Sequence, residues 1–210
     1  MKELRYFAVM FDLLTALLDS WTLWANITGD NDTAMKWRLK YLKLTYQLGV
    51  YRPYEEIVTL AAKETVLPRS YTDKLVKNWT ELKPWIEVKE VLTELKKHLP
   101  LAVVTNCSQV LGQQAADLCG VKFDVVVTSE RAGFYKPNPA PYTLALQELG
   151  IEPKKVLYVS GSAYDIRGAI DAGMDVYWHN RIGMVKPEEI PEPIIMTTSL
   201  MPLKEFIWTS

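Results

Sequence analysis

Four short runs of apolar residues recur along the chain, and each is followed by a loop and a helix-like stretch. The runs cover residues 6–11, 101–105, 123–128 and 156–160, and a weaker fifth covers 175–178. Several of them are rich in valine. Continuous apolar runs of this length are typical of strands covered on both faces, as in a parallel sheet.

Stretches with a helical period lie between these runs. In the clearest one, residues 88–98, four apolar side chains repeat at spacings of three and four. Similar patterns cover residues 111–118, 142–149 and 166–172, and a glycine stands near the expected end of each. Strands that alternate with helices predict an α/β fold with a doubly wound, mostly parallel sheet and right-handed crossovers.

One long segment interrupts this alternation. Between the first and second strands the chain has helical patterns only, over residues 33–49, 53–67 and 70–79, and they are rich in aromatic residues. We therefore expect a helical cap over residues 18–84, inserted into an α/β core made of residues 1–17 and 85–210. The tail after Pro187 is predicted to add one late strand near Ile194 and a short helix.

Composition narrows the possible partners of the chain. With 24 basic and 25 acidic residues among 210, the net charge is -1, which gives no electrostatic reason to expect nucleic acid. Two cysteines are too few for a disulfide framework and favour a reducing, cytoplasmic location. Residues 6–27 are apolar, but Asp12 and Asp19 interrupt them, so we expect no membrane span and a soluble protein.

Polar residues follow the predicted strands at the edge where ligands bind in open α/β sheets. Asp12 ends the first strand, Asn106 follows the second, Lys136 lies after the third, and Asp165 comes shortly after the fourth. Ionised side chains in such a cleft need partners, and Asp12 with Lys136 is the natural pair. A nearby ammonium keeps an aspartate ionised, as a nucleophile must be.

Four segments in this order resemble the motifs of the haloacid dehalogenase superfamily. They read FDLLTALLD at residues 11–19, VTN at 104–106, KP at 136–137 and SGSAYD at 160–165. The resemblance implies a Rossmann-like core and a helical insert that closes over the site as a lid. It also implies that Asp12 attacks the substrate and forms a covalent intermediate.

Two departures point to one branch of that superfamily. Its phosphatases usually carry acidic residues where this chain has Leu14 and Gly161, and magnesium prefers such oxygen ligands. The chain instead resembles the 2-haloacid dehalogenase branch, which needs no metal and no other cofactor. Residues 37–42, WRLKYL, match its cap segment, and Tyr142 follows Lys136 at the spacing found there.

The match to this branch is not complete. The branch has Gly-Thr at the third and fourth positions after the nucleophile, where this chain has Thr15 and Ala16, so the hydroxyl is displaced by one residue. The branch also has an asparagine where this chain has Ser162. These differences bear on how water is positioned and on the substrate.

The resemblance implies a reaction in two steps. Asp12 displaces halide from C2 of a small 2-haloacid, and water then hydrolyses the resulting ester to the 2-hydroxy acid. Arg38 is expected to help halide leave, Lys136 to keep Asp12 ionised, and Asp165 to orient or activate the water. The residues expected to bind substrate, halide or water are Thr105, Asn106, Ser160, Ser162, Tyr142 and Thr15.

Two alternatives stay open at this point. One is a magnesium-dependent phosphatase with degenerate motifs, and the other is a family member without catalytic activity. We also expect Arg38 to be an exposed residue of the cap, and Cys107 to be a buried small side chain rather than a reactive thiol. By analogy with the branch, a homodimer is expected as well.

Overall fold

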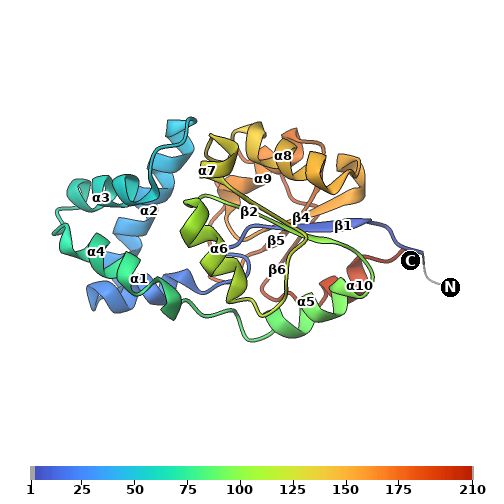
Figure 1. Cartoon of the computed structure of the whole chain (residues 1–210), viewed down its shortest axis with the longest axis horizontal. Coiled ribbons are helices and arrows are strands. Elements are labelled where there is room, and N and C mark those ends of the chain that lie inside the picture. The colour runs from blue at the N-terminus through green and yellow to red at the C-terminus, as the bar shows by residue number, and fades with distance from the viewer. Residues whose placement is uncertain (1–2, 210) are drawn as a thin grey trace.

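The computed structural model describes residues 3–209, with a six-stranded, all-parallel sheet at the centre (Figure 1). The strands are β1 (Ala8–Phe11), β2 (Leu101–Thr105), β3 (Val125–Thr128), β4 (Val156–Ser160), β5 (Asp175–His179) and β6 (Ile195–Thr197). Their order in the sheet is β3-β2-β1-β4-β5-β6. The chain thus starts in the middle of the sheet and adds strands first to one side and then to the other.

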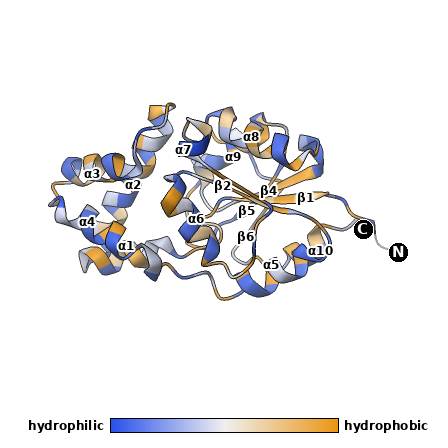
Figure 2. Ribbon diagram, in the orientation of Figure 1, coloured by the Kyte–Doolittle hydropathy of each residue, from blue (hydrophilic) through white to orange (hydrophobic). Residues whose placement is uncertain are grey.

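Strands β1 to β5 are largely buried on both faces, because each face is covered by helices, whereas the edge strand β6 is partly exposed. The core helices are α5 (Val88–Lys96), α6 (Gln109–Asp117), α7 (Ser129–Ala132), α8 (Pro139–Leu149), α9 (Ala163–Asp171) and α10 (Leu203–Phe206). Val9 and Phe11 pack into the apolar cluster that includes side chains of α5, α6 and α10. Ala8 and Met10, on the opposite face of the same strand, pack into the cluster formed with α8 and α9. Figure 2 shows the sheet as the most apolar part of the molecule.

The remaining helices gather to one side of the sheet, beyond its carboxyl edge (Figure 1). They are α1 (Ser20–Thr28), α2 (Asn31–Leu48), α3 (Tyr54–Glu64) and α4 (Ser70–Lys77), followed by the short 3₁₀ helix η1 (Trp79–Glu81). Their interior is aromatic: the ring of Trp24 lies 4.3 Å from that of Trp37 and 5.7 Å from that of Tyr41, measured between centroids. The entering and leaving segments meet in an isolated β-bridge between Leu18 and Pro84.

The predicted fold is confirmed. The predicted parallel sheet, the helical insertion after the first strand, the late strand and the short final helix are all present, with ends shifted by a few residues. The second 3₁₀ helix, η2 (Pro153–Lys155), leads into β4. No helix in residues 3–209 combines the length and the apolar character that crossing a membrane requires.

The register of the central strands explains why the polar residues meet. Phe11 of β1 is paired with Val103 of β2 on one side and with Val159 of β4 on the other. Asp12, one residue further, therefore lies level with the ends of both neighbouring strands. The carboxyl ends of parallel strands form one edge, and the helical insertion lies over that edge.

Candidate active site

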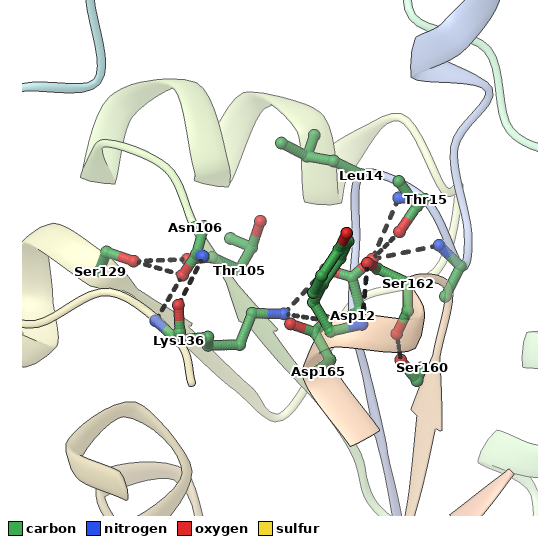
Figure 3. Close-up of polar contacts among 12 residues, drawn as sticks. Asp12, Leu14, Thr15, Thr105, Asn106, Ser129, Lys136, Ser160, Ser162 and Asp165 are labelled. Atoms are coloured by element: carbon green, nitrogen blue, oxygen red, sulfur yellow. Dashed lines mark hydrogen bonds and ion pairs between the residues drawn. The ribbon is translucent and has the colours of Figure 1, made fainter. Parts of the chain in front are cut away.

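Asp12 lies in a cradle formed by the loop that follows β1 (Figure 3). Its Oδ2 accepts hydrogen bonds from the backbone N–H groups of Thr15 (3.1 Å) and Ala16 (3.3 Å) and from the Thr15 hydroxyl (2.5 Å). The side chain is buried. A carboxylate oxygen carries two lone pairs, so the three donors already saturate Oδ2. Oδ1 is therefore the oxygen that is more available to attack a substrate.

Lys136 joins the two carboxylates of the site. Its Nζ donates to Asp12 Oδ1 at 2.9 Å, to Asp165 Oδ2 at 2.8 Å and to the Tyr158 hydroxyl at 3.0 Å. All three charged side chains are almost completely buried. All three N–H groups of the ammonium therefore donate hydrogen bonds, and the two carboxylates compensate its buried positive charge.

The two carboxylates have different proton affinities although they share one ammonium. Burial alone would raise the pKa of Asp12, but Lys136 and the hydrogen bonds from Thr15 outweigh it and hold that pKa below its ordinary range. Burial raises the pKa of Asp165, and the Asp12 charge adds to the rise against the opposing effect of Lys136. Burial would lower the pKa of Lys136, but the two carboxylates raise it. Asp12 is thus kept ionised, and Lys136 is kept charged.

Asn106 holds the loop that carries the lysine. Its Oδ1 accepts from the backbone N–H of Lys136 at 2.7 Å and from the Ser129 hydroxyl at 2.9 Å, while its Nδ2 donates to the Lys136 carbonyl at 3.2 Å. These bonds occupy most of the amide, which leaves one N–H of Nδ2 for a ligand. Beside it, the buried Thr105 Oγ1 has no hydrogen-bond partner within residues 3–209.

Of the remaining predicted site residues near the end of β4, one lines the pocket and the others lie behind it. Ser162 lines the pocket and, as the N-cap of α9, accepts from the Tyr164 N–H. Ser160 is turned away, since its hydroxyl donates to the Ser162 carbonyl at 2.5 Å. Tyr142 donates to the Asp165 carbonyl at 3.3 Å from the far side. Ser160 and Tyr142 therefore support the site from behind rather than face a substrate.

Arg38 is buried, with only 2% of its surface exposed, so the expectation of an exposed cap residue is wrong. Its guanidinium carbon lies 4.4 Å from the ring centroid of Trp21 and 5.3 Å from that of Trp24. Its Nε has no hydrogen-bond partner within residues 3–209. Burial lowers the pKa of Arg38, against the raising effects of Tyr54, Tyr41 and Asp12. A single sequence does not show that aromatic rings of the cap enclose this cation.

A small pocket lies between the cap and the carboxyl edge of the sheet, and its free volume is about 20 Å³. The residues that line it are Asp12, Leu14, Thr15, Arg38, Tyr41, Leu42, Tyr46, Thr105, Asn106, Lys136, Ser162 and Asp165. That volume holds a single water-sized group. The pocket combines two carboxylates, two cations and the apolar side chains of Leu14 and Leu42.

Tyr41 and Leu42 belong to the cap segment matched in the sequence, but neither they nor Tyr46 were expected to be site residues. The Tyr41 hydroxyl donates to the Asn106 carbonyl at 2.9 Å, and the Tyr46 hydroxyl donates to Asp165 Oδ1 at 3.1 Å. They follow Arg38 by three, four and eight residues on α2. Positions with these spacings share one face of a helix, so this periodicity could have revealed them.

The donor set does not suit a magnesium ion. Leu14 offers no oxygen to the pocket from its side chain, and Gly161 has no side chain, while Asp12 and Asp165 are bound to the Lys136 ammonium. Within residues 3–209, no group of three or more histidine, cysteine or acidic side chains is placed to hold a metal. Magnesium needs several oxygen ligands in near-octahedral geometry. The chemistry derived below therefore uses side chains and backbone N–H groups of the protein, and no metal ion.

Cys107 has no part in this arrangement. Its side chain is fully buried next to the site, and burial raises the pKa of the thiol far above its ordinary value. A thiol that stays protonated is a poor nucleophile. The expectation of a buried, unreactive Cys107 agrees with this environment.

Known proteins share this architecture. The protein-family model described as "haloacid dehalogenase-like hydrolase" matches residues 9–179. The (S)-2-haloacid dehalogenase 2 of Pseudomonas sp. (strain CBS-3) is 28% identical over an alignment of 199 positions that covers 86% of each chain. The N-acylneuraminate-9-phosphatase of Homo sapiens is 30% identical over 121 residues, covering 56% of this chain and 49% of that protein.

A solved structure with the same fold is the L-2-haloacid dehalogenase from Xanthobacter autotrophicus with chloropropionic acid covalently bound. It superposes with a TM-score of 0.84 at 21% identity, covering 96% of this chain and 98% of that one. The family match spans the first five strands and the insertion between β1 and β2. The resemblance found in the sequence is thereby confirmed: the chain belongs to the haloacid dehalogenase-like hydrolases.

Proposed function

We propose that this protein hydrolyses small 2-haloacids to 2-hydroxy acids without a metal, through an ester on Asp12. The observation that carries the proposal is the buried triad in which one ammonium, that of Lys136, holds both Asp12 and Asp165. A carboxylate with a lowered pKa, next to a cation and beside a small pocket that apolar side chains help to line, is suited to nucleophilic displacement at carbon. The dehalogenase names of full-length relatives support the same reaction.

In the first step, Oδ1 of Asp12 attacks C2 of the haloacid. The new bond joins Oδ1 to C2, and the carbon–halogen electron pair leaves with the halide. Arg38 is the cation on the cap side of the pocket, and negative charge grows on the halogen only as the bond breaks, so a fixed cation there favours the transition state. The Thr105 hydroxyl, which has no partner in the described part of the chain, and the remaining N–H of Asn106 can donate to the substrate carboxylate or to the halide.

In the second step, water attacks Cγ of the Asp12 ester and gives up a proton to Asp165. Negative charge develops on Oδ2, where the N–H groups of Thr15 and Ala16 and the Thr15 hydroxyl already donate. Collapse of this intermediate expels the alkoxide of the 2-hydroxy acid, which takes the proton from Asp165. Asp12 is left as the carboxylic acid and releases the second proton of the water to solvent, which restores the ionised nucleophile. Ser162 and Asp165 line the same part of the pocket and orient the water.

The substrate needs the cap to move before it can enter. The free volume of about 20 Å³ admits one water-sized group, whereas even a haloacetate has several heavy atoms. We infer that residues 18–84 act as a lid that opens for entry and closes for displacement, which excludes bulk water from the first step. The homodimer and the cytoplasmic location expected from the sequence stay predictions.

The test is a pair of assays on the purified protein. Halide release from 2-chloropropionate should persist in EDTA, while phosphate release from p-nitrophenyl phosphate should stay at background with added magnesium. The reverse pattern would instead establish the phosphatase alternative. Absence of both activities would favour a non-catalytic role.

A second test addresses the covalent route. In ¹⁸O-labelled water with enzyme in excess, the first turnover should place the label in Asp12 and leave the 2-hydroxy acid unlabelled, because water attacks the Asp12 carbonyl carbon. Asp12→Asn should abolish halide release while folding normally, since the amide has nearly the same shape but is a poor nucleophile. Label found directly in the product would exclude the ester.

A further inference from the structure

Two peptide groups in the loop after β1 supply the N–H donors that reach Oδ2 of Asp12. These are the peptide between Leu14 and Thr15, through the Thr15 N–H, and the peptide between Thr15 and Ala16, through the Ala16 N–H. A trans peptide is planar, so its carbonyl points away from its N–H. A donor that holds the carbonyl therefore also fixes the direction of the N–H.

Each of these two carbonyls accepts a hydrogen bond from a side chain behind the loop. The Leu14 carbonyl accepts from the hydroxyl of Ser20, and the Thr15 carbonyl accepts from Nε1 of Trp85 at 3.2 Å. The next carbonyl, that of Ala16, accepts from Nδ1 of the buried His179 at 2.8 Å. Three consecutive carbonyls are thus held by donors from three different parts of the fold.

Ser20 and Trp85 lie on the two segments that connect the cap to the core. Ser20 begins α1, and Trp85 directly follows the bridge between Leu18 and Pro84. The Trp85 indole is fixed in turn by the guanidinium of Arg181, 5.4 Å from its ring. Ser20 is 1% exposed, so its hydroxyl has no access to water as an alternative partner.

We propose that Ser20 and Trp85 are positioning residues for the hydrolysis step: they hold the two peptides whose N–H groups stabilise the charge on Oδ2 of Asp12. A carbonyl that accepts a hydrogen bond polarises its peptide and strengthens the N–H at the other end. Because both residues lie on the cap connections, cap closure and the donors on Asp12 are set by the same segments. This inference rests on the proposed function, in which Asp12 carries the ester.

The inference predicts different effects on the two chemical steps. Donors on Oδ2 stabilise the tetrahedral intermediate of hydrolysis, but they do not assist attack by Oδ1 on carbon. Weakening them should slow ester hydrolysis and leave the first halide release nearly unchanged. A residue that merely stabilised the fold would affect both steps together.

The experiment compares Trp85→Phe and Ser20→Ala, which remove one donor each and keep most of the packing. Steady-state kcat should fall about tenfold in each variant, as is typical for groups that orient a reacting group through another. The halide burst of the first turnover should stay within about threefold of wild type. The hydrogen bond that each variant loses is weak, and it does not take part in halide displacement. The Asp12 ester should accumulate and be visible by mass spectrometry of the intact protein.

Trp208→Phe is the matched control, because the indole of Trp208 also donates to a backbone carbonyl, that of Lys204 at 3.1 Å, far from the pocket. It should change neither the burst nor kcat.

A second readout does not depend on substrate: in ¹³C NMR titrations the pKa of Asp12 should rise in both test variants and not in the control. If kcat and the pKa of Asp12 were both unchanged in Trp85→Phe and Ser20→Ala, the inference would be wrong.

The two readouts separate failure of this inference from failure of the proposed function. If wild type releases no halide but the pKa of Asp12 still rises in the test variants, the positioning role stands and the substrate is wrong. If wild type is active and the burst falls as far as kcat, the two residues support the fold only, and the positioning role is wrong. Should Trp85→Phe misfold, the smaller change Ser20→Ala decides alone.

Discussion

The two walls of the pocket hold their charges in different ways. On the core side, Lys136, Asp12 and Asp165 form a closed set in which the ammonium donates to both carboxylates at 2.8–2.9 Å. On the cap side, Arg38 is equally buried but lies against the rings of Trp21 and Trp24, with its Nε unpartnered among residues 3–209. One wall is electrostatically complete without a ligand, and the other is not.

The difference indicates that the core wall is preorganised for the reaction and that the cap wall recognises the substrate. The core wall keeps the nucleophile ionised and oriented before substrate arrives, so little reorganisation is needed during the reaction. The cap wall contains a desolvated cation whose Nε has no hydrogen-bond partner within residues 3–209, and the anionic substrate that we propose can supply one. We therefore expect substrate binding and closure of the cap to be coupled through the charge on Arg38.

The largest expected effect comes from removing the cation of the core wall. Lys136→Met should lower kcat/KM by about a thousandfold and lower the free energy of unfolding by about 3–5 kcal/mol, because two carboxylates stay buried without their partner. Chemical denaturation and halide release measure the two effects. Lys122→Met, a change at an exposed lysine, is the control and should alter neither.

The second prediction removes the cation of the cap wall. Arg38→Met should slow the first halide release about a hundredfold, as expected for loss of one group that stabilises transition-state charge. Its stability should be unchanged or higher, because methionine packs among the tryptophans without the cost of burying a charge. Denaturation of both variants side by side checks this. Equal destabilisation by Lys136→Met and Arg38→Met would remove the contrast between the two walls.

The contrast also marks what a single sequence can predict. The core wall follows from local signals: apolar runs predict the strands, and parallel strands bring their carboxyl ends to one edge, where Asp12, Asn106 and Asp165 were expected together. The pairing of Asp12 with Lys136, 2.9 Å apart, follows from the cost of burying a charge alone. These inferences need only secondary structure and electrostatics.

The cap wall does not follow from local signals. Whether Arg38 is exposed depends on how α1 packs against α2, and the ring contacts that bury it join residues fourteen or more positions apart. Gly161 is a related case, since in the sequence it only marks a missing acidic ligand. In the structure a Cβ there would lie 2.2 Å from the Ala16 nitrogen, so glycine is what lets β4 approach the nucleophile loop.

The third prediction concerns how the charge of Asp12 affects the pKa of Asp165. The charge of Asp12 helps to raise the pKa of Asp165, so Asp12→Asn should lower that pKa while Lys136 keeps its position. Formation of the ester also neutralises Asp12, which means that the first step itself favours ionised Asp165 for the second. Titration of the Asp165 carboxyl by ¹³C NMR in wild type and Asp12→Asn measures the change. A rise or no change would contradict it.

The signs of these shifts also set how stability depends on pH. The folded-state pKa of Asp12 is lowered, so its contribution to the free energy of unfolding is present above the unfolded pKa and is lost as pH falls through the folded one. Asp165 has a raised pKa and acts oppositely: its contribution is present in acid and is lost as pH rises through the folded pKa. Acid denaturation of Asp12→Asn should therefore be shallower than that of wild type below about pH 4.

The smallest expected effect concerns a link between the two walls. The Tyr46 hydroxyl of α2 donates to Asp165 Oδ1 at 3.1 Å, and its ring lies 5.1 Å from that of Tyr164. Tyr46→Phe removes the hydrogen bond and keeps the ring contact, so kcat/KM should change by only about threefold, the size of one modest hydrogen bond. Hydrogen exchange should be faster in α2, because the closed cap loses a contact with the core. Tyr71→Phe, on α4 and outside the pocket lining, is the control. A loss as large as that of Arg38→Met would mean that the cap acts on Asp165 through Tyr46 and not on the substrate through Arg38.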